Sequence, residues 1–171
     1  GLRAPLDRAL VRMARDVDAG RLLGGSATAT AEALLGVLSL QRAEPSAARA
    51  ALATRMATLL VPLSAGGADL APWGARIDSS RADWHAWGAR STEALALAGA
   101  TLGRPDFVAA ARREADGLWT RFMLAGRAPE LVSPNGTATW YPEIAYGVGS
   151  IVEGYLALAD ATGERRSATL A

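Results

Sequence analysis

Two kinds of helical pattern alternate along the chain. In the first, apolar residues recur at three- and four-residue steps with charged residues between them, which predicts amphipathic helices over residues 5–19, 45–62 and 106–124 and a last one from 165. In the second, apolar residues occupy nearly every position, which is typical of helices buried on all sides. That pattern covers residues 28–42, 85–102 and 144–161. The sequence therefore predicts an all-α fold of antiparallel hairpins, with buried inner helices and amphipathic outer helices.

Two long segments interrupt these patterns. Residues 64–83 and 126–142 are rich in glycine, proline, aspartate and serine, which indicates loops. Each of these segments precedes a buried helix, whereas only a short break separates a buried helix from the outer helix after it. We therefore expect the long loops to gather at one end of the buried helices.

An internal repeat organises the chain. Glu32, Glu93 and Glu153 stand at matching positions of the three buried helices, 61 and 60 residues apart. Each is followed 12 or 13 residues later by the start of an outer helix, at Pro45, Pro105 and Arg165. A unit near 60 residues is longer than the usual helical solenoid repeat and suits a toroid better. Their recurrence indicates a structural role for the three glutamates, such as bonding the backbone of a neighbouring loop.

Composition excludes several classes of function. The 171 residues predict a single domain, 1–171, and half of them are apolar. The net charge is +1, all 18 basic residues are arginine, and no basic face emerges, so we expect no nucleic-acid partner. The absence of cysteine and the single histidine exclude thiolate and multi-histidine metal sites, and no cofactor is implied. No apolar run approaches the roughly 20 residues that span a bilayer, so no membrane partner is expected. The compartment is not predicted.

Four segments carry a resemblance to a known family: residues 84–88, 103–107, 144–147 and 154–163. They resemble the six-hairpin glycosidase-type (α/α) toroid superfamily, whose inner helices end in a similar Leu-Ala-x-x-Thr-Gly pattern. The resemblance implies a central cavity at one end of the inner helices, where carboxylates and aromatic residues act on sugars. A full toroid needs about six hairpins, and this chain holds about three. It is then a partial toroid, and three alternatives stay open: a fragment lacking flanking hairpins, a half that self-associates, or an open array.

Two loop carboxylates are the candidate catalytic pair. Hydrolysis of a glycosidic bond uses two carboxyl groups about 5 to 10 Å apart. Asp83 from the first long loop and Glu143 from the second could supply them, with Asp78 as a weaker substitute for Asp83. The structural alternatives are that Asp83 is the N-cap of the following helix and that Glu143 interacts with a helix dipole.

His85 and Arg90 are further candidates. His85 could act as a general acid or base because its free pKa lies near neutrality, or it could be a hydrogen-bonded structural residue. Arg90, one turn into the predicted helix, could hold a substrate carboxylate, or it could pair with Glu93 three residues later.

Aromatic residues cluster in the same loops. Sugar rings stack on exposed aromatic faces, so these residues suit a carbohydrate cleft, although they could equally pack the loops onto the helices. The candidate sugar platform is Trp84, Trp87, Trp140, Tyr141 and Tyr146.

The leading prediction is a carbohydrate-active domain that cleaves a glycosidic bond by acid/base catalysis in a loop-lined cleft. Its partner would be a carbohydrate or another small molecule. The alternative is a non-catalytic helical-repeat module that binds a glycan or a protein on the same loop face. Sugar epimerisation is a third interpretation, but such chemistry usually relies on several histidines, and the chain has one.

Overall fold

The computed structural model describes residues 3–25, 27–62, 84–85, 90–121, 131–132, 138–139, 149–165 and 169. Helices form the framework of these ranges, which confirms the all-α class. The helices are α1 (Arg3–Asp18), the 3-10 turn η1 (Leu23–Gly25), α2 (Ala27–Ala43), α3 (Ala47–Leu60), α5 (Ser91–Leu102), α6 (Pro105–Arg121) and α7 (Gly149–Thr162). Three two-residue strands, β1 (Trp84–His85), β2 (Leu131–Val132) and β3 (Ala138–Thr139), form a small antiparallel sheet.

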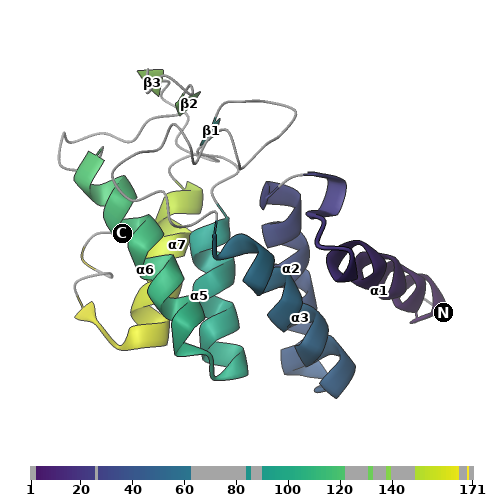
Figure 1. Ribbon diagram of the computed structural model, residues 1–171. Helices are drawn as coiled ribbons and strands as arrows, with labels where there is room; N and C mark the ends of the chain where they lie inside the picture. The colour runs from purple at the N-terminus through teal and green to yellow at the C-terminus, as the bar shows by residue number, and fades with distance from the viewer. Residues whose placement is uncertain are drawn as a thin grey trace.

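Helix α5 is the centre of the arrangement. It packs against α2, α3, α6 and α7, whereas α1 makes smaller contacts, chiefly with α3 and η1. Helices α2, α5 and α7 begin at the same end of the molecule, beside the strands, and run in the same direction (Figure 1). Helices α3 and α6 return in the opposite direction and cover one side of this row.

Small side chains let these helices approach closely. Alanines dominate the fully buried positions, and larger residues such as Leu34, Met56 and Phe107 fill the spaces between them. A Cβ atom on Gly99 would overlap the Val108 side chain and lie 3.0 Å from the Arg104 carbonyl oxygen. Backbone-to-backbone packing at Gly99 is therefore what allows α6 to fold back tightly on α5.

The turn between α5 and α6 depends on a second glycine. Gly103 has φ 65°, a left-handed conformation that glycine adopts at little cost and other residues rarely adopt. Its N–H and that of Arg104 both donate to the Gly99 carbonyl, which satisfies the end of the helix. The predicted break at residues 103–105 is confirmed.

The predicted start of the second buried helix is wrong. The sequence pattern placed it at His85, but His85 lies in β1 and α5 begins at Ser91, with Arg90 as its N-cap. Aromatic residues such as Trp84 favour strands, and Gly88 disfavours a helix, so local preference here outweighs the apolar pattern. Asp83 consequently does not cap α5, and Arg90 precedes the helix instead of lying one turn inside it.

Burial on all sides holds for only one of the three inner helices. In α5, Ala100 is the single exposed residue between Ser91 and Leu102. Helices α2 and α7 each keep an exposed side: Gly36 borders open space, and Leu156 is 46% exposed. The prediction is therefore correct for α5, which has neighbours on both sides in the row, and wrong for α2 and α7, which lie at its edges.

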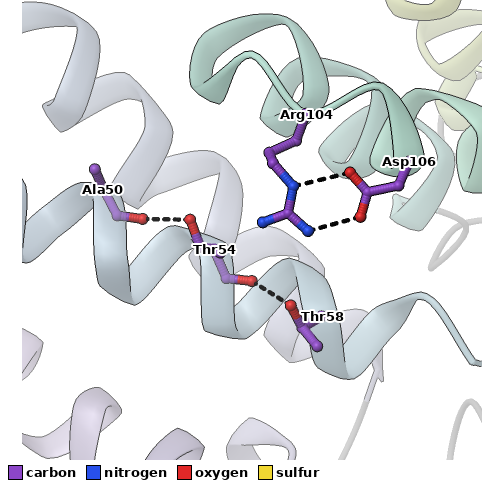
Figure 2. Close-up of polar contacts among 5 residues, drawn as sticks. All are labelled: Ala50, Thr54, Thr58, Arg104 and Asp106. Carbon is purple, nitrogen blue, oxygen red and sulfur yellow. Dashed lines mark hydrogen bonds and ion pairs between the residues drawn. The ribbon is translucent and has the colours of Figure 1, made fainter.

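Polar side chains on α3 and at the start of α6 form hydrogen bonds and ion pairs with groups close to them in the sequence. The Thr58 hydroxyl donates to the Thr54 carbonyl and the Thr54 hydroxyl to the Ala50 carbonyl, each at 2.8 Å (Figure 2). Across from them, Arg104 forms a two-pronged ion pair with Asp106 at 2.9 and 2.7 Å.

Candidate functional site

The candidate site lies at the end where α2, α5 and α7 begin. Strand β1 comes from the first long connection, and β2 and β3 come from the second. Trp84 pairs with Val132 and His85 with Leu131, so the two connections are joined by a backbone ladder. The sheet lies beyond the first turns of the three inner helices (Figure 1). Arg90, five residues after β1, brings the chain into α5.

Arg90 holds two carboxylates from different helices. Its guanidinium contacts Glu93 on α5, at 2.9 Å between Nη2 and Oε2, and through Nη1 it also bonds Oε2 of Glu153 on α7. The Arg90 and Glu93 side chains are largely buried, whereas Glu153 is 53% exposed. The predicted pairing with Glu93 is confirmed, and the arginine also ties α5 to α7. Among the described residues, the buried Nε atom of Arg90 has no hydrogen-bond partner.

The two carboxylates experience different surroundings. Burial raises the pKa of Glu93; Arg90 partly offsets this rise, and the nearby charge of Glu153 adds to it. The cluster therefore combines one guanidinium cation with two carboxyl groups that differ in burial.

A third carboxyl group lies beneath this cluster. Glu114 on α6 is fully buried and accepts a hydrogen bond from the Ser91 hydroxyl at the start of α5. Burial raises its pKa to about 7, while the hydroxyls of Ser91 and Thr92 lower it. One oxygen of the carboxyl, Oε2, has no partner among the described residues, which favours the protonated form. Glu114 therefore holds a proton near neutrality but has no access to solvent.

Helix α7 is fixed over the same region. Gly154 lies against Thr92, so that a Cβ atom added to it would come 3.1 Å from the Thr92 Cβ. One residue further, the buried Tyr155 hydroxyl donates to the Ala115 carbonyl of α6 at 2.8 Å. These contacts hold Glu153 in register with Arg90 and leave the cluster little freedom to rearrange.

Most of the predicted site residues lie outside the described part of the chain. These are Asp78, Asp83, Trp87, Trp140, Tyr141, Glu143 and Tyr146. Trp84 and His85 are placed as backbone in β1, and Arg90 is placed in full. The structure thus brings the two loop segments together at Trp84 and His85, and it leaves the predicted Asp83–Glu143 pair a prediction.

Sequence reasoning missed two members of the cluster. Glu153 was recognised only as a repeat position, although its match with Glu93 already placed both at the same level of neighbouring inner helices. Glu114 was not singled out, yet it lies three residues after Ala111 and seven after Phe107, on the predicted apolar stripe of its helix. A carboxyl group on such a stripe signals a buried, perturbed group.

No group of three or more histidine, aspartate or glutamate side chains able to hold a metal occurs among the described residues. Within the same ranges, none of the helices combines the length and the apolar character needed to cross a bilayer.

No protein-family model matches this chain, and no curated protein matches it either. The case for a function therefore depends on the residues and their arrangement.

Proposed function

We propose that this domain is a partial (α/α) toroid that binds a carbohydrate over the starts of α2, α5 and α7 and cleaves a glycosidic bond there. Asp83 and Glu143 are the acid/base pair in this proposal, and His85 is a secondary acid or base. The sugar would stack on Trp84, Trp87, Trp140, Tyr141 and Tyr146.

One observation carries the proposal. Three inner helices begin at the same end, and the β1–β2 ladder joins the two long connections over that end. The aromatic and acidic loop residues belong to those two connections. A cleft bounded by them would have Arg90 at its base, since this residue leads from β1 into α5.

The test is to incubate the protein with a panel of oligosaccharides and to measure hydrolysis as the release of reducing ends. Asp83→Asn and Glu143→Gln should each lower the rate by about 10²- to 10⁴-fold, the usual contribution of a general acid or base. Asp116→Asn, on the exposed face of α6, is the matched control and should retain the full rate. Full activity in both loop variants would refute the assigned roles.

A second function is favoured by the ion pairs. Arg90 binds both Glu93 and Glu153, so these two carboxylates are held together in one cluster. Such a cluster suits a non-catalytic module that recognises a glycan or a protein on the same loop face. Saturable glycan binding without turnover, unchanged by Asp83→Asn and Glu143→Gln, would select this function over hydrolysis.

A further inference from the structure

A groove crosses the opposite end of the inner helices, near the C-termini of α2, α5 and α7. Its volume is about 550 Å³, within the range of small-molecule sites. One wall is the last turn of α2, the other is the last turn of α7, and α5 forms the floor. Because α3 and α6 contribute no residue to its lining, the groove faces away from the outer helices.

The groove exists because side chains there are small. Ala100 on α5 and Ala157 and Ala161 on α7 line it, where larger residues would fill the space between the helices. Leu97 and Ala100 belong to the least buried side of α5, the same side as Arg90 and Glu93. The groove and the Arg90 cluster thus lie on one surface, about 16 Å apart along α5.

Its two walls carry opposite charges. Arg42 on α2 and Asp160 on α7 both line the groove and are both exposed. Neither forms an ion pair with another described residue, so both charges are available to a ligand. Asp160 therefore offers a partner for a cationic group, and Arg42 offers one for an anionic group.

One polar side chain of the groove is already fixed in place. The Gln41 Oε1 atom accepts a hydrogen bond from the Ser46 N–H at 2.9 Å. This bond positions the amide group and leaves its NH₂ as a donor. Gln41 stands next to Arg42 on the same wall, so two donor groups face a ligand at the α2 side. An acceptor such as a carboxylate suits that side.

From this arrangement we infer that the groove binds a short peptide with free termini, its amino group on Asp160 and its carboxylate on Arg42 and Gln41. Packed helices lie about 8–10 Å apart, so α2 and α7 stand about 16–20 Å apart across α5. A ligand that contacts both charges must therefore bridge the groove, and its volume of about 550 Å³ has room for a peptide of two to three residues.

Titration calorimetry with dialanine and trialanine tests this inference on the whole chain. Saturable binding is expected, and Arg42→Gln and Asp160→Asn should each weaken it by roughly tenfold or more, as the loss of a charge-assisted hydrogen bond does. N-acetylated peptide should lose the Asp160 contribution and peptide amide the Arg42 contribution. Each blocked peptide should therefore bind the wild type weakly and bind the corresponding variant no worse.

The matched controls are Arg113→Gln and Asp116→Asn, which remove the same charges from the exposed face of α6. These variants should bind both peptides as the wild type does. The inference is overturned if the peptides show no saturable binding up to about 10 mM. It is also overturned if free alanine binds equally well, or if the groove and control variants behave alike. Because the groove is distant from the loop end, none of these outcomes depends on whether the domain acts on sugars.

Discussion

Burial of Glu114 beneath the first turn of α5 couples the free energy of unfolding to one proton. Its pKa of about 7 lies above the ordinary value of 4.5, so the folded state binds this proton more tightly than the unfolded state does. The contribution of protonated Glu114 to the free energy of unfolding is complete below about pH 4.5 and is lost as the pH rises to about 7. Glu93, whose pKa is also raised, acts in the same direction.

We therefore expect the stability of the wild type to fall relative to Glu114→Gln between pH 4.5 and pH 7, by about 3 kcal/mol in all. Glutamine keeps the shape of the protonated side chain and cannot ionise. The measurement is urea unfolding of both proteins at a series of pH values. A constant difference across this range would show that Glu114 is already ionised in the folded state, and Asp116→Asn controls for the general loss of a carboxylate.

The sequence predicted the residues of the site unevenly. Arg90 and its pairing with Glu93 could be predicted because three residues separate two neighbours on a helix surface. The contact with Glu153 spans 63 residues, and only the packing of α7 on α5 brings it about. The contact between Glu114 and Ser91 could not be predicted for the same reason, because nothing in the local sequence of Glu114 indicates that Ser91 will lie against it.

At the scale of elements, two helical glycines should respond oppositely to the same substitution. Gly36 of α2 borders open space, so Gly36→Ala should raise stability by about 0.5–1 kcal/mol through helix propensity alone. Gly99 of α5 lies against Val108 and the Arg104 carbonyl, so Gly99→Ala should lower stability by about 1–3 kcal/mol despite the same gain in propensity.

Thermal or chemical unfolding of the two variants checks this prediction, each serving as the control for the other. A stabilised Gly99→Ala protein would mean that α5 and α6 can separate by several tenths of an ångström at little cost, contrary to the close approach described here.

Helix positions were predictable because apolar periodicity reports burial directly. The amphipathic pattern located α3 and α6 closely, and glycine at 103 marked the end of α5. The start of α5 was not predictable from that pattern, since Trp84 and His85 take part in strand pairing with residues almost fifty positions later. The exposure of one side of α2 and of α7 could not be predicted from the sequence either, because an apolar pattern does not show whether a neighbouring helix covers that side.

Across the whole molecule, burial is distributed very unequally among the helices. Helix α5 is enclosed by four neighbours, whereas α1 packs on α3 and η1 and exposes Leu6 and Val11. Backbone amides of α5 should therefore exchange with solvent only on global unfolding, and those of α1 through local opening. Hydrogen exchange followed by mass spectrometry should find α5 the slowest segment and α1 the fastest among the helices. Equal protection in both would mean that α1 is held by contacts beyond those described.

The central position of α5 also separates the chain into two interdependent pieces. Helices α1 to α3 precede it and α6 and α7 follow it, and α2, α3, α6 and α7 all pack against it. A polypeptide cut between residues 62 and 84 would leave the first piece without the surface of α5 that α2 and α3 contact. The two halves, expressed separately, would then be drawn back together by that surface, which makes this domain a natural starting point for a split reporter.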